Sequence, residues 1–305
     1  MMDILPEDLA AHHYFFVVAL IVLVSLYLHD LCTSRRCSCD DNEMVLHVYS
    51  YDGIDGPQCW KQFFESARGD RQSPINILYS STFPAEPVRP LVFSEEFHKT
   101  PTEMRLYNNT HNVVVYANWR LGKPPSLSGG PLDEQYRFLN MRFRWGHNDK
   151  EGSEHMIAST RYSMELQAAF IKSSVCDEDM TSAARNGSLM MLSYLFMVTP
   201  VDNPYLEPVV TGLRYIKHPL SYVCIEPIIL SLLMPEFSRD FYAYHGSLTF
   251  PPCTEGVLWI VKPEPLMVSS RQINQFRRIR SYCGYIENNA RPVEKINDRI
   301  IDYYG

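Results

Sequence analysis

The sequence is short of positive charge, and this shortage argues against a nucleic-acid-binding role. It has 28 lysines and arginines against 35 aspartates and glutamates, which gives a formal net charge of −7 over 305 residues. Domains that bind nucleic acids usually carry a basic surface that neutralises phosphates. The short cluster of Arg277, Arg278 and Arg280 is better explained as a solvated helix face. We therefore expect no nucleic-acid partner.

The chain also lacks a cysteine framework, internal repeats and low-complexity tracts. Its eight cysteines have neither the spacing of a disulfide-rich domain nor that of a zinc finger. With 46% hydrophobic and 21% charged residues, the composition is typical of one large globular domain with extensions. A small domain held together by disulfides is excluded.

One apolar run near the N-terminus is short for a membrane span. Tyr14 to Leu28 is continuously apolar apart from Ser25. As a helix it would cover roughly 22 Å, against ~30 Å of hydrocarbon. We expect the segment 14–32 to be a membrane anchor, with flanking histidines at the interface. A cleaved signal peptide is the alternative, although its usual basic start is missing, and a buried core helix is a third reading.

The charges around this run predict which side of the membrane the rest of the chain occupies. Acidic residues precede it in the segment 1–13, and Arg35 and Arg36 follow it. Positive charge tends to stay in the cytosol, so we expect a single-pass membrane protein with a cytosolic domain. Secretion after signal cleavage is the alternative. A polar linker, 33–46, then leads into a domain that we place at 47–305.

Two strand-like runs surround a polar turn in the middle of the chain. Phe138 to Trp145 alternates in polarity, so Arg142 and Arg144, two residues apart, share one face of a strand. A second run extends from Met156 to Phe170. If the two runs pair in an antiparallel way, Gln167 lies on the same side as the two arginines.

Other elements follow from periodicity and capping signals. Strands are predicted at Leu106 to Tyr116, Leu189 to Val198 and Val257 to Val261. Helices are predicted from Pro204 to Ile216 and from Ser269 to Arg280, the second with a serine cap. The many short strands separated by Pro and Gly favour a β-rich domain.

Several motifs resemble those of alpha-type carbonic anhydrases. They are RWGHNDKEGSEH from Arg144, the following MEL, GSLTFPPCTEGVLW from Gly246, RQSPINI from Arg71 and ARPVEKINDR from Ala290. The resemblance extends over roughly Tyr49 to Tyr304. It implies a mixed α/β, β-dominated fold, in which a large, mostly antiparallel, twisted central sheet carries short peripheral helices.

The resemblance places the three zinc-binding histidines of that family at Arg142, Arg144 and Gln167. A guanidinium is always charged and has no acceptor for a metal. Without zinc, no bound water is activated to hydroxide. The remaining histidines are scattered, and no pair of them lies in the ligand register. We expect no zinc and no other cofactor; a site built from substitute ligands is the alternative.

The resemblance also marks a vestigial cavity. His111 corresponds to the proton-shuttle position, although an ordinary exposed loop histidine is the favoured reading. Glu154 and Thr249 correspond to groups that orient the zinc-bound hydroxide, and here we expect them to form a buried hydrogen-bond network. Glu165 corresponds to a partner of the third ligand. Phe250 replaces a small polar residue and should narrow the cavity.

Leu248 and Trp259 correspond to the apolar wall of the cavity, and we expect both to pack in the core. The two arginines need acceptors, and we expect ion pairs with the glutamates of the cavity, with bidentate geometry. Binding of a small anion by Arg142 and Arg144 is the second reading.

The loss of all three ligands resembles the carbonic-anhydrase-related proteins, and LSGGPL and PPCTEGVLWI are most similar to the branch called related protein VIII. This resemblance implies an inactive, non-enzymatic module that binds a protein partner of unknown identity. A zinc-dependent enzyme that hydrates carbon dioxide is the alternative. Extracellular family members often bridge the position of Cys253, but the partner position falls near Ala67, which mildly favours a reducing compartment.

Overall fold

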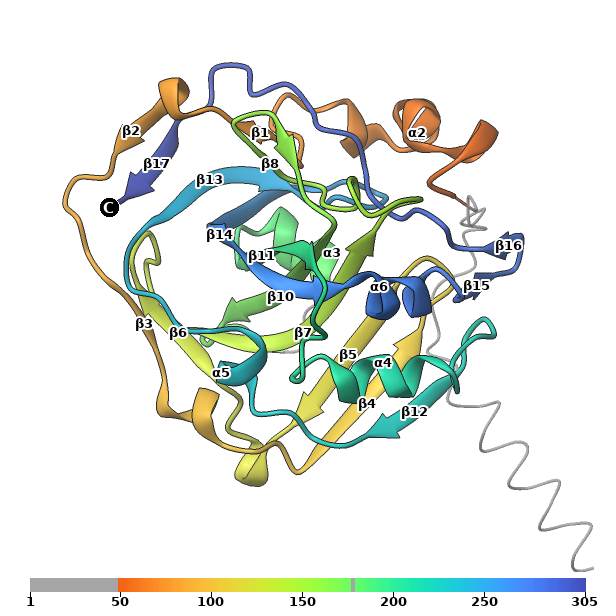
Figure 1. Cartoon of the computed structure of the whole chain (residues 1–305). Helices are drawn as coiled ribbons and strands as arrows, with labels where there is room; N and C mark the ends of the chain where they lie inside the picture. The colour runs from red at the N-terminus through yellow and green to blue at the C-terminus, as the bar shows by residue number, and fades with distance from the viewer. Residues whose placement is uncertain (1–48, 177–178) are drawn as a thin grey trace, which may run out of the picture. The chain divides into compact units, whose positions relative to one another are not determined.

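The structure is a computed structural model that describes residues 49–176 and 179–305 (Figure 1). A twelve-stranded sheet dominates it, and short helices lie around the sheet. The predicted fold class, a β-dominated α/β domain with a large twisted sheet, is therefore confirmed.

Ten of the strands follow one another across the sheet. Their order is β12 (Tyr222–Ile225), β4 (Glu103–Asn108), β5 (Val113–Asn118), β7 (Tyr136–Trp145), β10 (Met164–Lys172), β11 (Leu189–Thr199), β14 (Glu255–Ser269), β13 (Phe241–Ser247), β17 (Ile301–Tyr304) and β2 (Thr82–Pro84). β3 (Leu91–Phe93) pairs with β6 (Ser126–Gly129), which also pairs with β7. Neighbours are mostly antiparallel; β11 with β14 and β17 with β2 are parallel.

The remaining elements are short. Small sheets are formed by β1 (Asn76–Ile77), β8 (Met156–Ile157) and β9 (Thr160–Arg161), and by β15 (Arg280–Ser281) and β16 (Gly284–Tyr285). The α-helices are α2 (Pro57–Phe63), α3 (Met180–Arg185), α4 (Glu207–Leu213), α5 (Leu230–Leu233) and α6 (Ser270–Phe276). The 3-10 turns are Gly53–Asp55, Glu65–Arg68, Tyr79–Ser81, Glu95–His98 and Arg120–Gly122.

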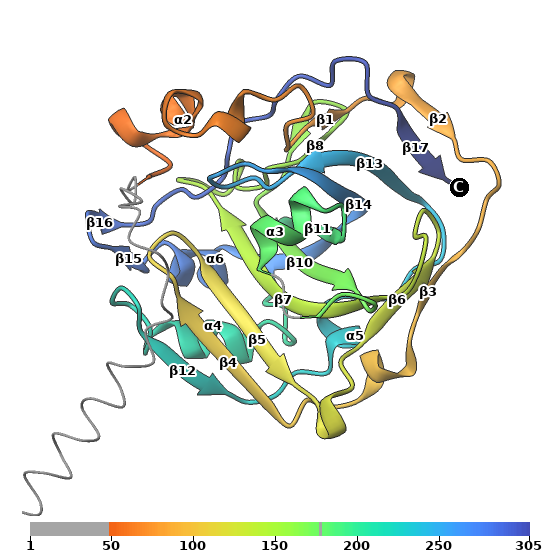
Figure 2. The same cartoon turned by 180° about the vertical axis from the view of Figure 1, so that it is seen from behind.

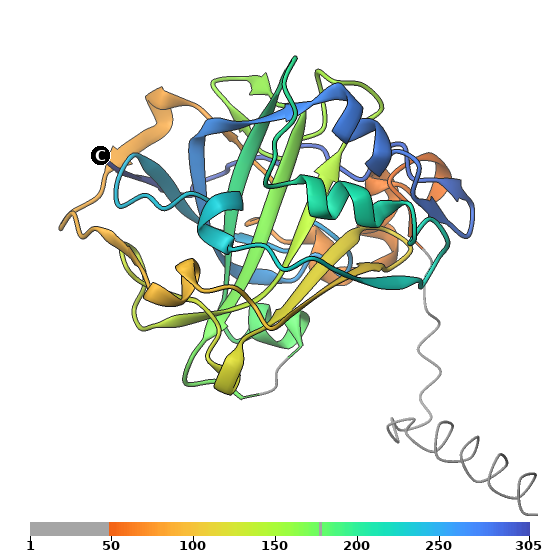
Figure 3. The same ribbon diagram turned by 60° about the horizontal axis from the view of Figure 1, so that its bottom comes forward.

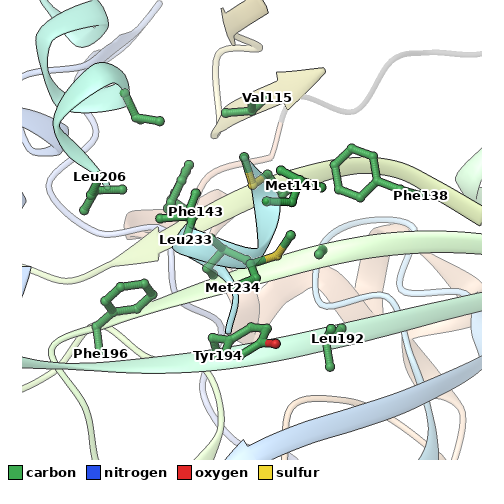
Figure 4. Packing of buried hydrophobic residues seen from close by; sticks show 14 of the residues in the cluster. Val115, Phe138, Met141, Phe143, Leu192, Tyr194, Phe196, Leu206, Leu233 and Met234 are labelled. Carbon is green, nitrogen blue, oxygen red and sulfur yellow. The ribbon is translucent and has the colours of Figure 1, made fainter. Parts of the chain in front are cut away.

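Side-chain alternation along β7 separates two environments. Met141, Phe143 and Trp145 enter the larger hydrophobic core. Figure 4 shows Met141 and Phe143 among its other side chains. Arg142 and Arg144 project from the other face, because successive residues of a strand point in opposite directions. A second hydrophobic cluster, which includes Trp259, packs on that other face. The arginines therefore lie beside a buried apolar surface.

The helices divide between the same two environments. α4, α5 and α6 lie toward the viewer in Figure 1, and α3 lies toward the viewer in Figure 2. Leu213 of α4 and Phe276 of α6 belong to the larger core, and the two helices contact each other (Figure 3). Ala183 and Ala184 of α3 belong to the second cluster. The sheet is thus covered on both faces, and the site lies on the face that α3 covers.

The predicted strand from Leu106 to Tyr116 is two strands, β4 and β5, joined by a tight turn. Asn108 is fully buried, and its Oδ1 accepts a hydrogen bond from the backbone N–H of Thr110 at 2.9 Å. Thr110 has a φ of 77°, a conformation outside any strand. Asparagine commonly closes turns in this way, so the alternation on both sides of the turn concealed a hairpin.

The predicted helices are present but shorter. α4 covers Glu207–Leu213 with a proline in its first turn, and α6 covers Ser270–Phe276. The serine cap is confirmed: Ser269 and Gln272 form a reciprocal capping box. The core strand predicted at Val257 to Val261 extends over all of β14.

No helix within residues 49–176 and 179–305 has the length and apolar character needed to cross a membrane. This finding contradicts the expected localisation as a single-pass membrane protein. The segment 14–32, on which that expectation rested, lies outside the described residues.

Candidate functional site

The structure brings the three expected ligand positions together. β7 and β10 run antiparallel, with Arg142 opposite Gln167 and Arg144 opposite Glu165. Because these residues occupy alternate positions of paired strands, their side chains project from one face. The prediction that Gln167 lies on the side of the two arginines is confirmed.

Arg144 is completely buried, and all three nitrogens of its guanidinium donate hydrogen bonds. Nε donates to Oε1 of Gln167 at 3.1 Å, and Nη2 donates to Oγ1 of Thr249 at 3.1 Å. Nη1 donates to the Tyr51 hydroxyl at 2.7 Å and to the Asn289 carbonyl oxygen at 3.2 Å. Acceptors from four parts of the chain thus hold this side chain in one orientation.

Glu154 supplies the counter-charge of Arg144. Its Oε2 lies 3.2 Å from Nε of Arg144, and neither side chain is exposed to solvent. Burial alone would lower the pKa of Arg144, but the Glu154 carboxylate raises it overall. Burial raises the pKa of Glu154, and the charge of Arg144 opposes that rise. One of the two expected arginine–glutamate pairs is therefore confirmed, although its contact is single and not bidentate.

Gln167 links this pair to the second glutamate. Its Nε2 donates to Oε2 of Glu154 at 2.6 Å and to Oε1 of Glu165 at 2.9 Å. The Oε1 atom of Gln167 already accepts from Arg144. Both the oxygen and the nitrogen of the Gln167 amide therefore form hydrogen bonds within this network.

Glu165 pairs with a histidine and not with an arginine, which corrects the expected second ion pair. Nδ1 of His155 lies 2.8 Å from Oε1 of Glu165, and Nε2 lies 2.7 Å from the Tyr244 hydroxyl. Glu165 also accepts from the Ser193 hydroxyl at 2.8 Å and from two backbone N–H groups. Burial alone would raise the pKa of Glu165, but the charge and hydrogen bonds of His155 and the hydrogen bond from Gln167 lower it to about 2.

Arg142 has no carboxylate partner among the described residues. Its Nε donates to Oδ1 of Asn140 at 3.3 Å, and its Nη2 lies 2.7 Å from Sδ of Met180. Its guanidinium carbon lies 4.5 Å from the ring centroid of Phe250. The expected salt bridge for Arg142 is wrong, because Glu154 pairs with Arg144 and Glu165 pairs with His155.

Phe250 contacts both arginines. The guanidinium carbon of Arg144 lies 5.7 Å from the same ring centroid. Leu248 and Trp259 are buried in the second cluster, as predicted, and Trp259 Nε1 donates to the Ser247 carbonyl oxygen at 2.9 Å. The ring of Phe250 is thus packed against two cations, and the narrowing of the cavity by this ring stays a prediction.

His111 is not the exposed loop histidine that we expected. It is partly buried, and its ring stacks on Tyr49 with 3.9 Å between the centroids. Burial, and then the charge of Arg144, lowers the pKa of His111 to about 4. The imidazole is therefore neutral near pH 7.

Sequence reasoning missed His155, Tyr51 and Asn289. His155 follows Glu154 directly in the motif EGSEH, and a histidine beside an acid is the one local signal that could have identified it. Tyr51 and Asn289 come from opposite ends of the domain, and no local pattern connects either residue to Arg144.

Zinc, the metal that the resemblance implies, does not fit the side chains at Arg142, Arg144 and Gln167. Two of them are guanidiniums, which repel a cation and have no acceptor, and the third directs its oxygen at Arg144. Within residues 49–176 and 179–305, no group of three or more His, Cys, Asp or Glu side chains could hold a metal. No chemical step through a metal follows from these positions.

Comparison with known proteins places this fold in a family. The family model for eukaryotic-type carbonic anhydrase matches residues 55–305. Mouse carbonic anhydrase 7 is 30% identical over 263 residues, which cover 84% of this chain and 96% of that protein. Carbonic anhydrase 1 of Monodelphis domestica is 32% identical over 233 residues, 76% of this chain and 87% of that protein.

These relatives are named as enzymes, and this finding contradicts the expectation that the chain is a non-enzyme. Cys253 and Ala67, which the resemblance treats as a disulfide position and its usual partner, do pack in one cluster. The extent of the match and the agreement of the motifs support a single conclusion: the chain belongs to the eukaryotic-type carbonic anhydrase family.

Proposed function

We propose that the chain takes part in the reversible hydration of carbon dioxide, the reaction after which its relatives are named. The observation that carries this proposal is the extent of the family match, which includes the central strands and all site residues from His111 to Trp259. The identity of 30% to mouse carbonic anhydrase 7 along nearly all of that protein supports it.

The geometry limits how this reaction can occur. Arg142, Arg144 and Gln167 offer no free metal-binding atom, so we propose that these positions hold no zinc. A zinc-dependent reaction therefore requires substitute ligands from other residues. Glu154 and Thr249 remain near the centre, but both contact Arg144 and serve to hold that cation.

A rate measurement tests the proposal. The full chain is mixed with carbon dioxide in a stopped-flow instrument, with and without added zinc, and a pH indicator follows proton release. Mouse carbonic anhydrase 7 is the positive control, and heat-denatured chain is the blank. We expect a rate above the blank that rises in proportion to protein concentration. A rate equal to the blank in both conditions would overturn the proposal.

Two finer expectations stay predictions. One is the assignment to the branch of carbonic-anhydrase-related proteins, which rests on the motifs alone. The other is the protein partner of unknown identity. The family match supports neither of them beyond the family itself.

A further inference from the structure

A large cavity lies beside the last strands of the sheet, away from the two arginines of β7. Its volume is about 1000 Å³, at the upper end of the range of ligand-binding cavities. Residues of β14, β13 and β17, which are neighbours in the sheet (Figure 1), line it. Among the described residues that line it, none comes from β7 or β10. The cavity is thus separate from the site described above.

Part of the cavity wall is apolar. Ala243 and Leu258 line it and belong to the larger hydrophobic core, whereas Arg142 and Arg144 project toward the second cluster. Ile300 also lines the cavity, and 63% of this residue is exposed. An exposed apolar side chain at the edge of a cavity offers a contact to the apolar part of a ligand.

Two arginines give one part of the cavity a positive charge. Arg299 is partly buried, and its Nε, Nη1 and Nη2 donate to the carbonyl oxygens of Ile296, His245 and Lys295 at 2.8, 3.3 and 2.6 Å. Burial, and then the charge of Arg71, lowers the pKa of Arg299. The side chain of Arg71 forms no hydrogen bond or ion pair with a described residue. A carboxylate placed here would relieve the repulsion between two cations.

Asp302 gives another part of the cavity a negative charge. This side chain on β17 is partly buried, and it forms no ion pair with a described residue. Burial raises the pKa of Asp302, and the neighbouring His245 opposes that rise. Burial, and then the charge of Arg71, lowers the pKa of His245 itself, so this ring is neutral near pH 7. A partly buried carboxylate therefore lacks a cationic partner.

Tyr244 connects the cavity wall to the buried network. It lines the cavity, and the guanidinium carbon of Arg299 lies 5.6 Å from its ring centroid. Its hydroxyl lies 2.7 Å from Nε2 of His155 and 2.9 Å from Oγ of Ser73. A ligand that contacts Arg299 should therefore change the chemical shifts of the His155 ring.

We propose that this cavity binds a small zwitterion of the short-peptide class. The carboxylate of the ligand meets Arg71 and Arg299, its ammonium group meets Asp302, and its apolar side chains lie against Leu258 and Ile300. A simple anion or a simple cation would balance only one of the two charges of the cavity, whereas a zwitterion balances both. The inference rests on the cavity and does not depend on the proposed hydration activity.

The test is a calorimetric titration of the full chain with leucyl-leucine at neutral pH. Two related compounds each lack one charge: N-acetyl-leucyl-leucine has no ammonium group, and leucyl-leucine amide has no carboxylate. We expect saturable binding of leucyl-leucine and affinities about tenfold lower, or less, for the other two, because each loses a charge-assisted hydrogen bond. In the isotope-labelled chain, leucyl-leucine should shift NMR signals of Tyr244 and His155 more than those of Arg142.

Three variants assign the two ends of the ligand. Asp302→Asn should weaken leucyl-leucine about tenfold and leave N-acetyl-leucyl-leucine unchanged, because that compound has no ammonium group. Arg71→Gln should weaken leucyl-leucine and leave the amide unchanged. Arg120→Gln is the matched control, because Arg120 is exposed and lies outside the cavity. Arg299 is left intact, since its guanidinium holds three carbonyl oxygens.

Three results would overturn the inference. They are the absence of saturable leucyl-leucine binding, equal affinity for leucyl-leucine and its N-acetylated form, and NMR shifts that are largest on β7 and β10. The comparison of the three compounds on the wild-type chain decides the matter even where a variant does not fold. The stopped-flow rate reports the proposed function separately, so a chain that binds leucyl-leucine without hydrating carbon dioxide would remove only that function.

Discussion

Nε of Arg144 lies 3.2 Å from Oε2 of Glu154, and both side chains are fully shielded from solvent. This pair lies where the family resemblance places a zinc ligand and the acid that orients the metal-bound hydroxide. In this chain the acid balances a protein cation instead. A buried ion pair of this kind is stable only while both partners are present.

We predict that Arg144→Met lowers the free energy of unfolding by about 3–5 kcal/mol, because it leaves the Glu154 carboxylate buried without its partner. The measurement is equilibrium unfolding in urea, monitored by circular dichroism. Adding Glu154→Gln to the same chain should restore much of the loss, since no uncompensated charge then remains. A loss below about 1 kcal/mol in the single variant would show that Glu154 finds other compensation.

The pKa of Glu165 gives a prediction about acid stability. Its folded-state pKa is depressed from 4.5 to about 2. A carboxyl group with a depressed pKa contributes stability that is complete above its unfolded pKa and is lost as the pH falls toward the folded value. Between pH 5 and pH 3, therefore, the stability difference between wild type and Glu165→Gln should shrink. Urea unfolding of both chains across this window is the measurement, and a constant or widening difference would contradict it.

The pKa of His111 should lie far below that of an ordinary histidine. Burial and the Arg144 charge lower its pKa from 6.5 to about 4. Because the folded state disfavours the proton, His111 contributes stability above the unfolded pKa that is lost as the pH falls through this range. The imidazole Cε1 proton, followed by NMR from pH 8 to pH 3.5, should show no midpoint above about 5. A midpoint near 6.5 would mean that the ring is exposed to solvent.

A triple substitution restores the ligand types. We predict that Arg142→His, Arg144→His and Gln167→His together create a zinc site, because β7 and β10 hold these positions on one face and Glu165 remains close to residue 167. Calorimetric titration with zinc is the measurement. Each single substitution should bind no zinc, since a remaining arginine repels the cation. A folded triple variant without zinc affinity would argue against this placement.

Phe250 should then limit catalysis more than metal binding. Its ring packs against the positions of both arginines. Adding Phe250→Thr to the triple variant should raise the hydration rate more than it raises zinc affinity. Equal changes in both quantities would show that the ring acts on the metal site itself.

Strand periodicity was enough to predict which side chains of the site share one face of the sheet. Alternation placed Arg142 and Arg144 on one face, and antiparallel pairing added Gln167. The different partners of the two arginines were not predictable. His155 pairs with Glu165. Tyr51 and Asn289, which lie far from Arg144 in the sequence, accept hydrogen bonds from its guanidinium. Such contacts depend on tertiary packing, which leaves no periodic trace in the sequence.

The hairpin between β4 and β5 shows a second limit. Apolar residues occur on both sides of the turn, and Asn108 closes the turn through a side-chain hydrogen bond with the backbone N–H of Thr110. The sequence alone does not distinguish an asparagine that closes a turn from one that faces solvent. Periodicity alone therefore merged two strands into one.

The central claim is that Arg144 and Glu154 have replaced the metal at these positions. Its most direct test is the zinc content of the full chain and of Gln167→Leu, each purified with excess zinc, dialysed and measured by elemental analysis. We predict the same zinc content in both chains, because Gln167 does not ligate a metal. One zinc per chain in wild type that disappears in a folded Gln167→Leu chain would contradict the claim.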